Sequence, residues 1–430
     1  MSRRTGATAV LLAVLMALGG CSSTGGSGAA SASPTPSVPV SQLTCQQAAS
    51  GVVAAVKERV ASYEVSTSSA SPSASVQPSS PSTAQLDPLT AAVALARDTI
   101  TQQRCTQAEF TADLERGLQS IHPTGTIATA VLARISATLL GTMGQASETK
   151  AVWPTQDLAQ AAAEAAPGST LELQAGTYQL SDSLVLLDDI TIEGAGKGQT
   201  IIQSTAPDAA VVVATGSPVE LNGLSVLLSG KVPASGVVSG PSARLVLTDV
   251  RISGAQSANG QGGAGVQMSA AASQPAGTQT TLEVTGSQFD HNSWAGITVS
   301  GGHRVSIESS TFSDNGQCGV CFLDAASGSI EKGTFTNNAV GVGVTGTAAP
   351  VVIRSTITGG TVGIQVADSA APIIDNVTIT GASRAAAIFS GNSTGSMTHV
   401  SCVNNKYDVA IANSAAPSVG DNSCTLVRGK

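Results

Sequence analysis

Apolar residues in the second half of the chain return at a fixed interval. An apolar residue recurs every 22 or 23 residues, another lies five positions before it, and a third follows seven to nine positions after it. The first set is Phe289, Phe312, Phe335, Ile357, Ile379 and Cys402; the second is Val284, Ile307, Ile330, Val352, Ile374 and Met397; the third is Ile297, Val320, Val342, Ile364, Ile388 and Val409. A period in the twenties indicates a solenoid, in which each repeat forms one coil.

Each repeat contains short stretches of alternating apolar and polar residues between Gly, Asn and Ser, which predicts strands and turns. Leucine-rich repeats share the period, but their Leu consensus is absent. We therefore predict a mainly β fold, a right-handed parallel β-helix over residues 148–430. Looser copies centred on Val226 and Ile252 extend the repeat upstream, and a Gly/Ala/Ser-rich insertion lies near residues 254–280.

Stacked coils place each repeat position in one column, because neighbouring strands lie ~4.8 Å apart. The three Phe residues of the first set then form a core stack. One polar column contains Asn292, Asn315, Asn338 and Asn405. Amides of stacked Asn side chains can bond from coil to coil, and Asn tolerates the left-handed backbone of a sharp turn. We interpret the Asn column as architectural.

The region before the repeats has helical periodicity. Residues 42–147 contain stretches with apolar residues three and four apart, as in Val52, Val53, Val56 and Val60, and Thr106 with Glu109 forms a capping-box signal. A Ser/Pro-rich insert near residues 66–85 is predicted to be disordered. We expect a small α-helical domain here. Its Cys45 and Cys105 are candidates for a disulfide outside the cytoplasm.

The N-terminus has the pattern of an export signal. Arg3 and Arg4 precede an apolar stretch from Ala7 to Leu18, which is too short to span a membrane. The stretch ends in Leu-Gly-Gly-Cys, which resembles the lipobox of bacterial lipoproteins. The resemblance implies a signal peptide over residues 1–20, lipidation of Cys21, and attachment to the extracytoplasmic side of the cell membrane. Residues 21–41 are predicted to be a flexible Ser/Gly/Pro-rich tether.

Composition supports an extracellular location. Charged residues are 11% of the chain and aromatic residues 3%, and the formal net charge is −8. The chain contains no run of Lys and Arg, so we expect no nucleic-acid partner. We also expect a monomer.

The entry to the repeat domain carries recognisable motifs. Pro167-Gly168-Ser169-Thr170-Leu171 follows a short helical stretch, and Gly176-Thr177-Tyr178 comes shortly after. These residues resemble the first coil of the pectin-lyase-like β-helix proteins, and the later repeats resemble the PbH1 repeat of that superfamily. The resemblance covers about residues 153–425. It implies the fold more strongly than an activity, because this fold hosts lyases, hydrolases, epimerases and non-enzymes.

Candidate chemistry is confined to one cluster. Asp290 and His291 follow Phe289, and Asp314 lies one coil further in the same column as His291. A carboxylate beside a histidine can serve in acid–base catalysis, and the nearby Trp294 could stack on a sugar. The alternative interpretation is a solvated polar turn. The Asp clusters of lyases and the paired motifs of hydrolases of this fold are absent. We predict no metal site and no cofactor; Ca²⁺ is expected only if the protein is a lyase.

Two cysteine pairs lie in the repeat domain. Cys402 and Cys424 are 22 residues apart, one coil, so stacking predicts a disulfide that secures the last coil. Cys318 and Cys321 would be ~10 Å apart in an extended strand, beyond the ~7 Å reach of a disulfide. We therefore expect two separate buried thiols, unless the turn before Gly319 brings them together.

Three functions fit these features. The first is a lipoprotein whose β-helix binds polysaccharide or another envelope component. The second is a polysaccharide lyase or glycoside hydrolase with an atypical site near Asp290, His291 and Asp314. The third is a structural spacer.

The lipobox generates a direct prediction. The Cys21→Ala protein should leave the membrane fraction and appear in the medium or as unprocessed precursor, because it lacks the acyl chains that anchor it. Fractionation and immunoblotting measure this. Mature variant in the membrane at the wild-type level would contradict the prediction.

Overall fold

The structure of the protein is a computed structural model. It describes residues 43–64, 88–102, 105–124, 126–142, 144, 146–187, 189–213, 216–240, 242–268, 279–412 and 414–428. The chain divides into two compact units, Met1–Gln145 and Ala146–Lys430. This division lies close to the predicted boundary at residues 147 and 148. The predicted signal peptide, Cys21, the tether and the 66–85 insert lie outside the described residues.

The first unit is helical. Its helices are α2 (Cys45–Glu64), α3 (Pro88–Thr101), α4 (Gln107–Gln119) and α5 (Thr126–Leu140). Val52, Val56 and Val60 are buried, so the periodic apolar face of α2 forms part of this core. Among the described helices none is long and apolar enough to cross a membrane.

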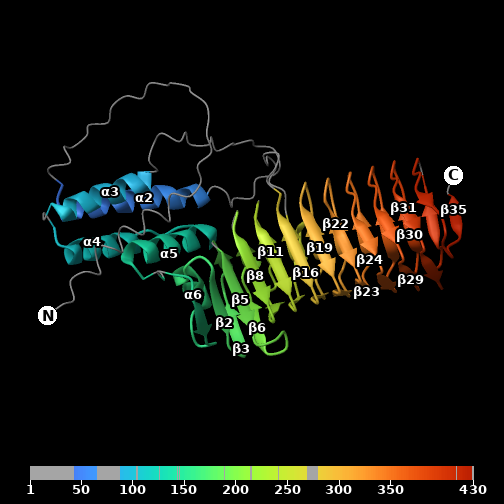
Figure 1. Ribbon diagram of the computed structural model, residues 1–430, viewed down its shortest axis with the longest axis horizontal. Helices are drawn as coiled ribbons and strands as arrows, with labels where there is room; N and C mark the ends of the chain where they lie inside the picture. Colours follow the sequence, from blue (N-terminus) through green and yellow to red (C-terminus); the bar gives the residue numbers. More distant parts are fainter. Residues whose placement is uncertain are drawn as a thin grey trace, which may run out of the picture. The chain divides into compact units, whose positions relative to one another are not determined.

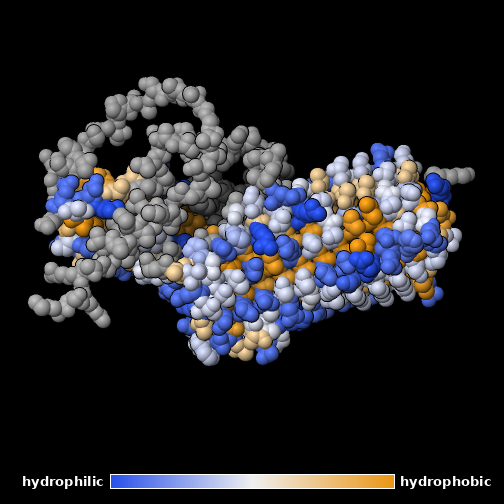
Figure 2. Space-filling model, in the orientation of Figure 1, coloured by the Kyte–Doolittle hydropathy of each residue, from blue (hydrophilic) through white to orange (hydrophobic). Residues whose placement is uncertain are grey.

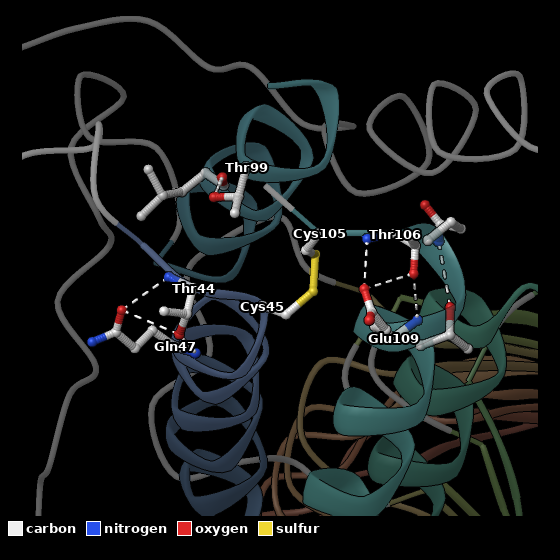
Figure 3. The surroundings of a disulfide bond; sticks show 10 residues. Thr44, Cys45, Gln47, Thr99, Cys105, Thr106 and Glu109 are labelled. Atoms are coloured by element: carbon white, nitrogen blue, oxygen red, sulfur yellow. Dashed lines mark hydrogen bonds between the residues drawn. A yellow bond between two sulfur atoms is a disulfide. The ribbon is translucent and has the colours of Figure 1, made fainter. Parts of the chain in front are cut away.

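The start of α4 is fixed by a capping box and a disulfide (Figure 3). The Glu109 amide donates to the Thr106 hydroxyl at 3.2 Å, and the Thr106 amide donates to the Glu109 carboxylate at 3.0 Å. The Cys45–Cys105 disulfide joins this point to the start of α2, with a Cα–Cα distance of 5.3 Å. The pairing of these two cysteines therefore agrees with the sequence expectation.

The second unit is a parallel β-solenoid, shown in profile in Figure 1. The short helix α6 (Leu158–Glu164) covers the first coils, since Leu158 and Ala161 pack into the same apolar core as Leu171 and Leu184. Asp157 caps this helix by accepting from the Gln160 amide at 3.0 Å. The core is thereby shielded from water at its N-terminal end.

Three long sheets run the length of the solenoid, and each coil contributes strands to them in the order A, B, C. Sheet A contains β1 (Thr149–Val152), β2 (Ser169–Leu173), β5 (Ile190–Gly194), β8 (Pro218–Asn222), β11 (Arg244–Thr248), β16 (Thr281–Thr285), β19 (Arg304–Glu308), β22 (Ser327–Glu331), β25 (Val351–Ile353), β28 (Ile373–Asp375), β31 (Ser396–Thr398) and β34 (Ser418–Val419).

Sheet B contains β3 (Gly176–Leu180), β6 (Thr200–Ser204), β9 (Ser225–Leu228), β12 (Arg251–Ser253), β17 (Gln288–Asp290), β20 (Thr311–Ser313), β23 (Thr334–Thr336), β26 (Thr356–Thr358), β29 (Thr378–Thr380) and β32 (Ser401–Val403).

Sheet C contains β4 (Leu184–Leu186), β7 (Asp208–Val213), β10 (Ala234–Ser239), β15 (Ala264–Met268), β18 (Ala295–Val299), β21 (Cys318–Phe322), β24 (Val340–Val344), β27 (Val362–Val366), β30 (Ala385–Phe389), β33 (Val409–Ile411) and β35 (Leu426–Arg428). A small hairpin, β13 (Ser257–Ala258) with β14 (Gln261–Gly262), lies in the predicted insertion.

The first two predicted core columns are confirmed by the strand register. Phe289, Phe312 and Phe335 stack with ring centroids 5.1 and 4.9 Å apart. The third column was wrong at one coil, where Ala387 and not Ile388 aligns with Ile364. Phe389 points into the core, and successive strand residues face opposite sides, so Ile388 must face outward.

The Asn column forms a hydrogen-bonded ladder between sheets B and C. Asn315 accepts from the Asn292 amide side chain at 3.0 Å and donates to Asn338 at 2.8 Å. Each side chain also donates to a backbone carbonyl, as Asn338 does to Phe312 at 2.9 Å. The column is interrupted at Gly360 and Ala382. Asn405 resumes it in the next coil, where it donates to the Ile379 carbonyl and accepts from the Ala382 amide.

The sequence suggested that the ladder Asn residues themselves take the left-handed backbone of the turn. In the structure, the residue before each of these Asn residues takes it. His291, Asp314 and Asn337 have φ of 55°, 54° and 55°, and each precedes a ladder Asn. The ladder residue itself is buried to bond its neighbours, whereas the residue before it makes the turn.

The Cys402–Cys424 disulfide is present, with a Cα–Cα distance of 5.1 Å. It links β32 to the segment before β35, where the last coil has no further coil to pair with. This closure agrees with the prediction from the one-coil separation.

The ladder predicts a large effect of one side chain. Asn338→Ala should lower the unfolding free energy by ~1–3 kcal/mol, because Asn315 and the Phe312 carbonyl lose buried partners. Chemical denaturation measures the change. Gln317→Ala is the matched control, since Gln317 is exposed and its side chain bonds to no other described residue; equal effects of the two variants would contradict the structural role of the ladder.

Candidate functional site

The predicted cluster centres on Asp290, a buried carboxylate on the outer face of sheet B. Its side chain is 2% exposed. Arg251 on the adjacent strand β12 donates to both carboxylate oxygens at 2.8 and 2.7 Å, and the Ser253 hydroxyl donates at 3.0 Å. The ring nitrogen Nδ1 of His291 lies 2.8 Å from the same carboxylate.

Electrostatics keep this carboxylate ionised. Burial alone would raise the pKa of Asp290, but the bonds from Arg251, His291 and Ser253 outweigh it and lower the pKa. The same pairing raises the pKa of Arg251. A carboxylate that accepts two hydrogen bonds from one guanidinium is held rigidly, and both of its oxygens already have a donor.

The other predicted members are not drawn into this network. His291 and Asp314 occupy adjacent coils, and the backbone amide of His291 donates to Ser313. Asp314 is exposed, and its side chain makes no hydrogen bond to another described residue. His291 therefore bonds its neighbour Asp290 and not Asp314. Among the described residues, no three His, Cys, Asp or Glu side chains are placed to hold a metal ion.

Sequence analysis missed Arg251. The coil that separates Ile252 from Phe289 is 37 residues long because of the insertion. The 22–23-residue period therefore did not reveal that Arg251 pairs with Gln288, which places its side chain beside Asp290. His303 is also buried, and its Nδ1 accepts a hydrogen bond from the Thr280 amide at 3.2 Å.

Cys318 and Cys321 form a disulfide, contrary to the expectation of two separate thiols, with a Cα–Cα distance of 5.6 Å. Gly319 and Val320 both face the core: Val320 is fully buried, and a Cβ on Gly319 would lie 2.5 Å from the Phe335 ring. Two consecutive inward residues break the alternation, so both cysteines point outward. Trp294 packs against this pair and is half-buried, which leaves only part of its ring for a ligand.

The outer face of sheet A is the most varied surface of the solenoid. Its middle row is Glu283, Ser306, Ser329, Val351 and Ile373, aligned from strand to strand. The row beside it contains Glu308, Glu331, Ile353 and Asp375. We call these two rows the sheet A face.

Ion pairs border the sheet A face on both sides. Arg244 lies 3.2 Å from Glu283, Lys332 lies 3.1 Å from Glu308, and Arg354 lies 2.5 Å from Glu331. These pairs are solvent-exposed, so each stabilises the fold little and remains free to exchange partners. Figure 2 shows a strip of hydrophobic residues that runs along the long axis of the solenoid, with hydrophilic residues on both sides of it.

The family model described as a right handed beta helix region matches residues 264–424. The solenoid is a right-handed parallel β-helix. No curated protein sequence matches the chain.

Three solved structures show partial similarity to the chain. ORF18 of Geobacillus virus E2 is 12% identical, with a TM-score of 0.44, over 60% of this chain and 54% of that chain. The tailspike protein TSP2 of Escherichia coli O157:H7 bacteriophage CAB120 is 12% identical, with a TM-score of 0.46, over 58% of this chain and 42% of that chain. Pectate lyase Pel9A is 13% identical, with a TM-score of 0.35, over 66% of this chain and 80% of that chain. The chain thus spans about half the length of the two phage proteins.

The Arg251–Asp290 pair predicts a pH dependence of stability. Because the folded pKa of Asp290 is lowered, its contribution is present above the unfolded value of ~3.9 and is lost as pH falls through the folded value. Asp290→Asn should lower the unfolding free energy by ~1–3 kcal/mol at neutral pH. The difference from wild type should shrink below about pH 4.

Denaturant titrations at pH 7, 5 and 3 measure this difference. Asp314→Asn is the matched control, since it makes the same chemical change on an exposed side chain. A gap between wild type and Asp290→Asn that stays constant over the whole range would refute the pairing.

Proposed function

We propose that the chain is a lipid-anchored protein on the extracytoplasmic side of the cell membrane and that it binds a linear polysaccharide along the sheet A face. The observation that supports this best is the alignment of that face. Equivalent positions recur from coil to coil at ~4.8 Å, so bonding groups form rows along the solenoid axis. A repeating surface suits a repeating polymer.

The chemistry of these rows fits sugar units. Glu283, Ser306 and Ser329 offer carboxylate and hydroxyl groups in line, and carboxylates accept hydrogen bonds from sugar hydroxyls. The bordering Arg and Lys residues are donors that can turn from their ion pairs to a ligand at little cost, because exposed pairs are weak. Polar groups on this face are therefore available for both bonding roles.

The apolar end of the face provides a second kind of contact. Val351 and Ile353 are half-buried, and Ile373 is 49% exposed. Apolar side chains in a row of polar groups can cover the C–H faces of sugar rings, where burial of apolar surface is favourable. A chain that crosses from Glu283 to Ile373 would meet both surfaces.

The geometry around Asp290 favours binding over catalysis. A general acid or base must reach a substrate proton, and both oxygens of Asp290 are already bonded to Arg251. Anchoring is supported by the Leu-Gly-Gly-Cys motif and the Ser/Gly/Pro-rich segment after it, which would place the solenoid away from the membrane surface.

Affinity electrophoresis tests the proposal with a panel of soluble linear polysaccharides, both uncharged and uronate-containing. Ser306→Lys should weaken binding about tenfold, because a long side chain in the middle row keeps the polymer off the face. Ala325→Lys is the control: it adds the same charge at an exposed turn between β21 and β22.

Equal binding by wild type and Ser306→Lys would refute this site. Release of unsaturated or reducing sugars, abolished in a His291→Asn, Asp314→Asn double variant, would replace the binding function with the enzymatic alternative. Asn suits both positions because it accepts positive φ.

A further inference from the structure

The outer face of sheet B carries hydroxyl groups in two parallel rows. One row is Thr311, Thr334, Thr356, Thr378 and Ser401; the other is Ser313, Thr336, Thr358 and Thr380, and it ends at Val403. These nine residues, on β20, β23, β26, β29 and β32, are called the hydroxyl face. In the first row each Thr directly precedes an inward Phe or Ile, and the second row comes from the residue after that core side chain.

The hydroxyl face is open to solvent. Thr311, Thr334, Thr356, Thr358 and Thr378 are exposed, and the other members are half-buried. None of the nine hydroxyl groups bonds to another described residue, in contrast to Ser253 and Asp290 at the equivalent position of the preceding coils. Their bonding capacity is therefore directed to something outside the fold.

The two rows form a regular lattice. The five strands pair in register without offset, so neighbours in a row are ~4.8 Å apart and the rows are ~6.6 Å apart. All side chains are Thr or Ser, which are short and nearly equal in length, so their ends lie near one plane. The spacing is set by the backbone ladder and cannot drift from coil to coil.

Strand propensity alone does not account for this uniformity. Thr is favoured in strands, but Val, Ile and Tyr are favoured as strongly. The sheet A face is the internal comparison: it has the same parallel pairing and carries Glu, Ser, Val, Ile and Asp at aligned positions. The restriction to hydroxyl side chains is thus particular to sheet B.

The composition of the hydroxyl face limits the class of ligand that it can bind. It contains no charged group to attract an ionic polymer and no aromatic ring to stack on a sugar. Each Thr offers one hydroxyl, which can donate and accept, and one methyl group. The ligand must match a flat two-dimensional repeat of about 4.8 by 6.6 Å. The shorter repeat is close to an oxygen spacing of hexagonal ice, and the longer one has to be matched only once because the face has two rows.

We propose that the hydroxyl face is an ice-binding surface. The hydroxyl groups hydrogen-bond to oxygen positions of the ice lattice, and the methyl groups between them are covered by the ordered water of the same layer. Little entropy is lost on binding, because β-branched side chains on a rigid ladder are already held in place. This activity is separate from polysaccharide binding and uses a different sheet.

The test is inhibition of ice recrystallisation by the full chain carrying Cys21→Ala, which keeps it in solution. At micromolar concentration this protein should keep ice grains small and should enter a slowly growing ice hemisphere. Thr334→Lys with Thr358→Lys should reduce inhibition about tenfold or more, because two long side chains hold the plane away from ice. Ala325→Lys is the control for added charge and should inhibit as the parent does.

Two further measurements keep the outcome clear. Thr334→Val with Thr358→Val preserves shape and strand propensity while removing two hydroxyls, so its loss of inhibition cannot come from misfolding. Polysaccharide binding should be unchanged in both double variants, which separates this inference from the proposed function. Exclusion of the parent from ice, as for serum albumin, or full inhibition by the double Lys variant would overturn the proposal.

Discussion

Parallel pairing between successive coils is the interaction on which this molecule depends. Each strand bonds to the strand one coil earlier and one coil later, in register, over most of the second unit. The pairing fixes both the rise per coil and the column in which each side chain lies. A residue type is therefore chosen for a column as much as for a position, as the three stacked Phe rings show.

The turns impose the second constraint. At the corner between sheets B and C, the residue before each ladder position takes positive φ, whether or not that position is Asn. The residues that do so are His291, Asp314, Asn337, Gly359, Gly381 and Asn404. Polar and Gly residues gather there because they accept this backbone best. A His and an Asp in one column thus resemble a catalytic pair for a reason that is conformational, and the side chain that His291 bonds is its neighbour Asp290.

The residues available for binding are the outward-facing ones, because the core does not constrain their type. The inward columns are apolar in most coils, with exceptions such as the buried Ser239 between Val213 and Met268. The outward rows differ between sheets: mixed charge, hydroxyl and aliphatic groups on sheet A, and hydroxyls alone on much of sheet B. Both outer faces inherit the spacing of the backbone ladder, so each is matched to ligands that repeat. This links the fold to binding of extended surfaces more directly than to the chemistry of a single deep pocket.

The repeat period was enough to predict the solenoid, its first two core columns, the Asn ladder and the Cys402–Cys424 closure, because all of these follow from a period that equals one coil. Features that depart from that period became visible only in the folded chain. Arg251 reaches Asp290 across a coil lengthened by an insertion, and Ala387 displaces Ile388 from its column. Cys318 meets Cys321 because two consecutive residues turn inward. In each case the chain departs locally from the repeat period or from strand alternation, and the packing of the backbone decides which residues then meet.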